Sequence, residues 1–189
     1  MGFTVAMGLV GIVLAAGAGT RAGGPKVLRS TDGEPWVTRA VDRLRAGGCD
    51  PVVVVLGAAT DAALPLLPTG AVPVVATGWA DGVSASLRAG LAAAGATDAV
   101  AAVVTLVDLP GLPTDVVTRL LEAPPDERTL RRVVVDGVPS HPVVLGRRHW
   151  VPLAEAVSGD TGAGPYLRDR GAQPVECGDL WDGADADRP

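Results

Sequence analysis

Four nearly continuous apolar runs constrain the fold of this chain more than any other feature of its sequence. They span residues 9–15, 52–56, 72–76 and 100–107. Strands that are covered on both faces have this continuous pattern, whereas strands with one solvent-exposed face alternate between apolar and polar residues. The four runs therefore predict a buried sheet of parallel strands.

Helical periodicity separates these runs. Apolar residues recur at helical spacing over 37–44, and Gly47 supplies a stop. The same spacing follows at 83–91, and again at 116–121, where we expect Thr114 to cap the helix. Alternating strands and helices with right-handed crossovers predict an α/β fold: a doubly wound, mostly parallel sheet with helices on both faces. Ligands of such folds bind at the carboxyl ends of the strands.

The second half of the chain has a different pattern. Residues 131–135 and 142–145 flank the turn pair Asp136-Gly137, which predicts a hairpin or neighbouring mixed strands. The segment 124–127 is expected to be a loop rather than a domain boundary, because the residues after it are too few to fold alone. We therefore expect one domain over residues 1–189.

A glycine-rich loop with two cations directly follows the first run. Gly17 and Gly19 lack a Cβ, so the backbone can turn its N–H groups toward a polyanion. Arg21 offers a planar fork of donors for phosphate oxygens, and Lys26 a compact charge. The loop predicts a phosphate-binding site.

Other glycine loops fit less well. Pro25 and Val27 break the Gly-Lys-Ser/Thr core of a P-loop. A dinucleotide fingerprint tolerates Ala22, but the second run ends at Gly57-Ala58 with no acidic residue for a ribose hydroxyl. A plain strand-to-helix turn leaves the two cations unexplained. A nicotinamide-dependent oxidoreductase and a non-catalytic nucleotide-binding module stay open as rival classes.

The loop resembles the signature Leu-Ala-Ala-Gly-x-x-x-Arg-x-Gly-x-Pro-Lys of the MobA-like NTP transferase superfamily. The Ala-Ala-Gly and Pro-Lys forms are similar to its molybdenum cofactor cytidylyltransferase (MocA-like) branch, whereas the guanylyltransferase branch usually carries Ala-Gly-Gly and Asp-Lys. Later motifs follow in the family's order: 78–87, Asp108-Leu109-Pro110, His141-Pro142-Val143, 159–163 and the terminal Asp185-Ala186-Asp187. The resemblance thus extends over most of the chain.

This resemblance implies a nucleotide-diphospho-sugar transferase type of fold and an Mg²⁺-dependent nucleotidyltransferase. The enzyme would move a nucleoside monophosphate from an NTP, with CTP favoured, to a small phosphorylated acceptor. Molybdopterin is the leading acceptor, and pyrophosphate would leave. A different phosphorylated acceptor, with GTP or another NTP, is the alternative. Such transfer needs charge neutralisation and alignment but no side-chain nucleophile, so the lack of a Ser-His-Asp constellation is expected.

The resemblance also implies a role for individual residues. The catalytic residues would be Lys26, Arg21 and Asp108, with Mg²⁺ held by Asp108 and Asp187. The acceptor would contact Trp79, His141 and Asp160, but Gly164 stands where the related motif has arginine, which leaves the acceptor's identity open. The nucleotide would contact Leu14, Ala15, Ala16, Gly17, Gly19, Arg21, Lys26, Gly82, Ser84 and Ser86.

Several of these residues have simpler structural alternatives. Asp108 could cap the turn before Pro110, Ser84 could cap a helix, and Asp160 could cap the helix that runs to residue 170. Trp79 could pack in the core. The acidic C-terminal tail could fray. His149, between arginines, is expected on a solvated helix face.

Composition excludes some classes of protein. The chain has 16 basic and 21 acidic residues and a net charge of −5, which argues against a nucleic-acid partner. Cys49 and Cys177 form no Cys-x-x-Cys pair, so free thiols are expected. The N-terminal apolar stretch is interrupted by Thr4 and Gly8, which predicts neither a signal peptide nor a membrane span. These features favour the cytoplasm.

Overall fold

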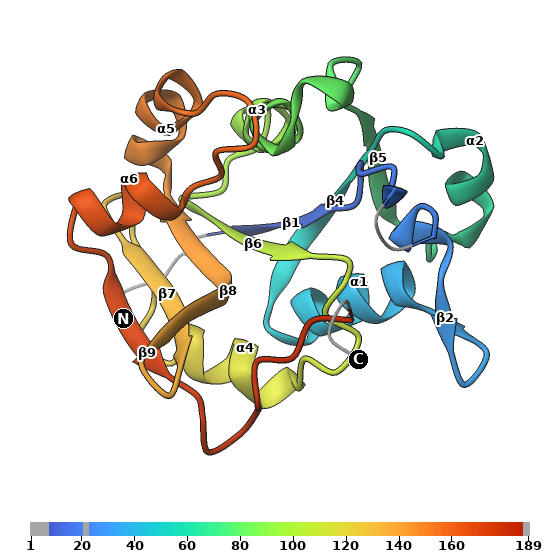
Figure 1. Cartoon of the computed structure of the whole chain (residues 1–189). Helices are drawn as coiled ribbons and strands as arrows, with labels where there is room; N and C mark the ends of the chain where they lie inside the picture. Colours follow the sequence, from blue (N-terminus) through green and yellow to red (C-terminus); the bar gives the residue numbers. More distant parts are fainter. Residues whose placement is uncertain (1–7, 21–22, 187–189) are drawn as a thin grey trace, which may run out of the picture.

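The central feature of the computed structural model, which describes residues 8–20 and 23–186, is a seven-stranded sheet (Figure 1). Its strand order is β5-β4-β1-β6-β8-β7-β9. The four predicted runs form neighbouring parallel strands, as expected. The strands are β1 (Leu9–Leu14), β4 (Cys49–Leu56), β5 (Ala71–Val75), β6 (Ala101–Leu106), β7 (Leu130–Val135), β8 (Val138–Gly146) and β9 (Gln173–Glu176).

Helices cover both faces of this sheet, which confirms the doubly wound prediction. The helices α1 (Trp36–Ala46) and α4 (Thr114–Leu121) lie on one face, and α3 (Val83–Gly95), α5 (Trp150–Ala156) and α6 (Gly164–Asp169) lie on the other (Figure 1). The short helix α2 (Thr60–Ala63) precedes the edge strand β5. A small ribbon of β2 (Ser30–Thr31) and β3 (Glu34–Pro35) precedes α1.

Two apolar clusters, one on each face of the sheet, form the core. Alternate residues of a strand point to opposite faces, so Val13 and Val54 pack with α1 while Ile12 and Val55 pack with α3. Fully burying one such side chain is worth about 1.5–3 kcal/mol. The continuous apolar pattern of the strands therefore reflects burial on both sides.

The starts of three helices differ from the sequence expectations. Thr114 is the first residue of α4, and Pro113 occupies the N-cap position with no side-chain bond. Gly82 precedes α3 and Ala163 precedes α6, also without side-chain caps. Ser84 and Asp160 are therefore not helix caps.

The environment of His149 also differs from its prediction. Its ring nitrogens lie 3.1 Å from the Tyr166 hydroxyl and 3.1 Å from the Arg128 carbonyl oxygen. The side chain is partly buried rather than on a solvated helix face.

The two cysteines are free and buried, as predicted. No helix in residues 8–20 or 23–186 combines the length and apolarity needed to cross a membrane.

The predicted hairpin is present, and hydrogen bonds to Glu176 hold its turn. Asp136 and Gly137 have φ values of 50° and 76°, as a type I′ turn requires. The Glu176 carboxylate accepts hydrogen bonds from the backbone N–H groups of both turn residues and of Cys177 and Gly178. These donors hold the pKa of Glu176 below its ordinary value of 4.5.

The hydrogen bonds of the Glu176 carboxylate predict a loss of stability at acidic pH. A carboxylate whose pKa is depressed by folding stabilises the protein above its unfolded pKa, and the contribution is lost as pH falls through the folded value. We expect Glu176→Gln to lower stability near neutral pH and to match the parent protein well below pH 4.5. Urea unfolding across this pH range measures the difference. Glu155→Gln, at an exposed glutamate, is the control. If stability falls equally with decreasing pH in the parent protein, Glu176→Gln and Glu155→Gln, the Glu176 carboxylate does not stabilise the turn.

Candidate active site

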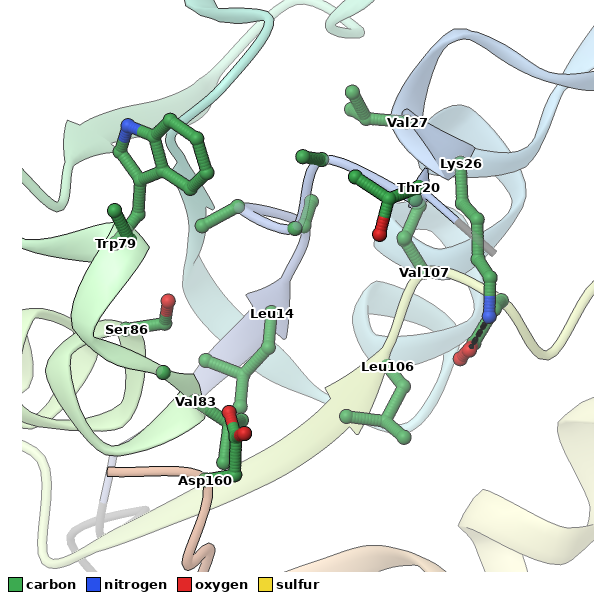
Figure 2. A pocket seen from close by; sticks show the side chains of 18 residues that line it. Leu14, Thr20, Lys26, Val27, Trp79, Val83, Ser86, Leu106, Val107 and Asp160 are labelled. Atoms are coloured by element: carbon green, nitrogen blue, oxygen red, sulfur yellow. Dashed lines mark hydrogen bonds and ion pairs between the residues drawn. The ribbon is translucent and has the colours of Figure 1, made fainter. Parts of the chain in front are cut away.

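A cavity of about 540 Å³ opens at the carboxyl ends of β1 and β6. The loop after β1, the loop after β6, the start of α3 and the loop at Asp160 form its walls (Figure 2). This is the edge of a doubly wound sheet at which ligands bind. Neighbouring parallel strands thus bring the glycine loop and the Asp108 motif together.

The glycine loop closes on itself through Gly19. Its φ is 60°, a left-handed conformation, and the Gly24 N–H donates to the Gly19 carbonyl at 2.9 Å. A Cβ on Gly19 would lie 1.9 Å from the Gly24 carbonyl oxygen, so only glycine fits. The chain then enters a short 3₁₀ turn at residues 26–28 that carries Lys26 into the cavity.

Lys26 and Asp108 form an ion pair on one side of this cavity. Lys26 Nζ lies 2.6 Å from Asp108 Oδ2, and the two side chains are 17% and 19% exposed (the dashed line in Figure 2). The other carboxylate oxygen, Asp108 Oδ1, is buried and has no hydrogen-bond partner within the described residues. Within that part of the chain the Asp108 side chain caps no turn.

Trp79, Ser86 and Asp160 lie across the cavity from Lys26 (Figure 2). On this side of the cavity Gly82 packs against the loop at Gly159. Its φ is 110°, and a Cβ there would lie 2.4 Å from the Gly159 carbonyl oxygen. The Ser84 N–H donates to the same oxygen at 3.0 Å, so the start of α3 holds the loop that carries Asp160. The partly buried Trp79 both lines the cavity and packs against the core.

A second cavity of about 210 Å³ adjoins the first and shares Leu14, Val83 and Leu106 with it. Its polar side chains are those of Arg132 and His141. Desolvation lowers the pKa of His141 to about 4; the charge of Asp108 opposes this shift and that of Arg132 adds to it. His141 is therefore neutral at neutral pH.

The end of the described chain returns to the Asp108 loop. The Ala186 N–H donates to the Asp108 carbonyl oxygen at 3.0 Å. Asp187, the predicted second metal ligand, and Arg21, the predicted phosphate clamp, lie outside the described residues. Within residues 8–20 and 23–186 no three His, Cys, Asp or Glu side chains form a metal-binding group.

Most other predicted site residues meet in the first cavity. Ser84 lines neither cavity; it is buried, and its Oγ accepts a hydrogen bond from Arg88 at 3.4 Å. His141 lines only the second cavity. The predicted residues that line the first cavity are Leu14, Ala15, Ala16, Gly17, Gly19, Lys26, Trp79, Gly82, Ser86, Asp108 and Asp160.

Sequence reasoning missed several lining residues. Thr20, Val27 and Val107 are sequence neighbours of motif residues, and this adjacency could have indicated that they line the same cavity. Arg132 was also missed, although β7 carries two consecutive arginines, Arg131 and Arg132, and neighbouring residues of a strand point to opposite faces of the sheet, so one of them must point toward a covered face.

Comparison with known proteins agrees with this architecture. The sequence profile of the MobA-like NTP transferase domain matches residues 11–175. A relative from Paenarthrobacter nicotinovorans, named nicotine blue oxidoreductase, is 34% identical over 99% of this chain and 96% of that protein.

Solved structures share the fold. Rv0371c from Mycobacterium tuberculosis is 28% identical, with a TM-score of 0.74 over 91% of this chain and 88% of that one. A second structure of that protein, a complex with manganese, is 26% identical, with a TM-score of 0.69 over 89% of this chain and 86% of that one. The nucleotidyl transferase Mth528 from Methanothermobacter is 20% identical, with a TM-score of 0.74 over 89% of this chain and 86% of that one, which shows the common fold alone.

A mostly parallel sheet with a glycine loop and Asp108 at the carboxyl ends of neighbouring strands is typical of a nucleotide-binding α/β protein. The chain belongs to the MobA-like NTP transferase family. It is a nucleotidyltransferase of the MobA-like type.

Proposed function

We propose that this enzyme transfers CMP from CTP to a small phosphorylated acceptor of the molybdopterin type, with release of pyrophosphate. Its place would be molybdenum cofactor biosynthesis in the cytoplasm, where NTPs are available. The observation that carries the proposal is the convergence of the glycine loop, Lys26 and Asp108 in one cavity.

Lys26 and the loop amides are suited to holding a triphosphate. Gly17 and Gly19 let the backbone approach a polyanion closely, and Lys26 is near enough to exchange its pairing with Asp108 for a phosphate oxygen. Preorganised donors of this kind stabilise charge that develops on the α-phosphate. A phosphate acceptor is already ionised at neutral pH and needs no general base.

Asp108 fits a divalent cation. Its Oδ1 is a buried carboxylate oxygen without a hydrogen-bond partner in the described residues, and Mg²⁺ binds through one or two carboxylates plus phosphate oxygens. Asp108 and, by our proposal, Asp187 would hold this ion. The bound ion would neutralise phosphate charge and orient the triphosphate. The manganese complex of Rv0371c supports metal use in a related protein.

The acceptor would lie on the opposite side of the site. Trp79 offers a flat apolar surface, and Asp160 faces the cavity from the loop before α6. His141 lies in the adjoining cavity, where it is neutral and can donate or accept one hydrogen bond.

A second candidate function is nicotinamide-dependent reduction of a heteroaromatic compound. The relative named nicotine blue oxidoreductase favours it, because that protein matches nearly the whole chain. Such an enzyme would consume NADH or NADPH and release no pyrophosphate.

Pyrophosphate release separates the two candidates. The full chain is incubated with each NTP, Mg²⁺ and molybdopterin or another phosphorylated acceptor, and in parallel with NADH or NADPH and nicotine blue. Pyrophosphate that depends on the acceptor supports transfer. Nicotinamide oxidation without pyrophosphate contradicts it.

For nucleotide choice, we expect CTP to bind at least about tenfold more tightly than GTP in the presence of Mg²⁺, a difference of about 1.4 kcal/mol. The guanylyltransferase branch usually carries glycine where this chain has Ala16, which is among the residues that line the cavity, and the proposed preference rests on this difference. Calorimetric titration with both nucleotides measures the preference.

The matched variant is Ala16→Gly, which should bring the two affinities closer together. Equal or tighter binding of GTP by the parent protein contradicts the cytidylyl assignment and leaves the fold unaffected.

A further inference from the structure

The second cavity is a chamber between the sheet and helices α3 and α6 that opens toward the first cavity. Leu87 of α3 and Leu167 of α6 form its roof, and Val104 and Val143 form its floor. Its volume of about 210 Å³ exceeds that of an engineered apolar cavity of about 150 Å³ that admits benzene. The chamber therefore has room for one or two fused rings.

Sheet register places Arg132 on the floor of this chamber. Val104 of β6 pairs with Val143 of β8, and Val143 pairs with Arg132 of β7. Directly paired residues of antiparallel strands point to the same face, so the three side chains form one row under α3 and α6. A core-facing row of this kind normally carries apolar residues, and a charged one requires a partner.

Within residues 8–20 and 23–186 no acidic side chain forms an ion pair with Arg132. Its Nε atom is buried and has no hydrogen-bond partner in that part of the chain. Burial lowers the pKa of Arg132, and the neighbouring charge of Arg168 adds to this effect. Arg132 as a whole is partly buried, and Nε is its buried atom without a partner. Since buried polar atoms are almost always paired, the guanidinium is suited to an anion that enters the chamber.

We propose that this chamber binds a small planar aromatic acid, with the ring between Leu87 and Val143 and the anionic group on Arg132. The shared residues Leu14, Val83 and Leu106 connect the chamber to the first cavity, so the bound acid would lie beside the nucleotide site, where part of an acceptor could enter. That role rests on the proposed function, whereas the binding does not.

Direct binding of 2-naphthoate tests the proposal. Titration calorimetry with the full chain, without nucleotide, should give a dissociation constant of about 0.1–1 mM, as expected for a ligand of this size. The uncharged 2-naphthamide should bind about 10- to 100-fold more weakly, because a hydrogen bond to a charged group is lost.

Arg132→Met removes the charge and retains an apolar stem. It should weaken 2-naphthoate binding about 10- to 100-fold and abolish the preference over the amide. Arg132→Lys should keep part of that preference. Arg128→Met, at an exposed arginine near the other end of the sheet, is the matched control and should bind like the parent protein.

Filling the chamber gives an independent test. A Cβ on Gly162 would lie 3.8 Å from Val83 Cγ1, and both residues line the chamber. Gly162→Val should therefore block both naphthalene compounds and leave CTP binding within about twofold of the parent value. Thermal unfolding of each variant confirms that it is folded.

Three results would overturn the proposal: no saturable binding, equal affinities for the acid in the parent protein and folded Arg132→Met, or simple displacement of 2-naphthoate by CTP. Binding with the expected variant pattern but no pyrophosphate release in the transferase assay supports the chamber assignment and contradicts the proposed transfer. The experiments therefore distinguish a failure of the chamber proposal from a failure of the proposed transfer.

Discussion

Lys26→Ala is expected to lower kcat by about 10²- to 10³-fold, the usual cost of removing one donor that stabilises transition-state charge. Lys26 lies in the glycine-loop cavity and has a short ion pair with Asp108. A loop lysine supports little core packing, so stability should fall by only about 1 kcal/mol through loss of that pair. Acceptor-dependent pyrophosphate release and thermal unfolding measure the two effects.

Arg128→Ala is the control for this variant. It removes an exposed cation far from the cavity and should change neither quantity. If Lys26→Ala keeps its activity within a few fold while its melting temperature falls sharply, Lys26 is structural and the proposed mechanism is wrong.

A chain that ends at Gly183 is expected to lose at least about 10²-fold in kcat at low Mg²⁺, and excess Mg²⁺ or Mn²⁺ should repair part of the loss. Changes to groups that merely support metal ligands already cost about 10- to 100-fold, and this truncation would remove Asp187, the proposed ligand itself. The bond from the Ala186 N–H to the Asp108 carbonyl brings the tail to the Asp108 loop, the proposed metal site.

Asp187→Asn in the full chain separates the carboxylate from the rest of the tail. It should reproduce most of the metal-dependent loss, whereas Asp182→Asn, nearby on the same tail, should not. Unchanged kcat and unchanged Mg²⁺ dependence in the truncated protein would show that Asp187 is not a ligand.

Local patterns predicted much of the fold. The apolar runs became parallel strands because residues buried on both faces must all be apolar, and this requirement is visible within a few consecutive positions. Asp136-Gly137 became the hairpin turn because its backbone conformation favours these residue types. Motif order likewise indicated which loops form the first cavity.

Helix starts were less predictable. Thr114 and Ser84 are good capping residues, yet both lie inside their helices. Pro113, whose ring fixes φ, stands at the start of α4 instead. At α3 the left-handed Gly82 takes this place, because it lies against the carbonyl of Gly159. Capping preference is a weak local signal that tertiary packing overrides.

By itself, the sequence determined the class of fold and the family, because each depends on short-range order along the chain. Only the tertiary structure decided which groups meet. Lys26 and Asp108 are 82 positions apart, and their pairing follows from strand neighbours in the sheet. Arg132 lies in an apolar chamber because register across three strands places it there. The Asp136-Gly137 turn sets the pairing of β7 with β8, but the pairing of β8 with β6 joins distant segments and is fixed only when the sheet packs against its helices.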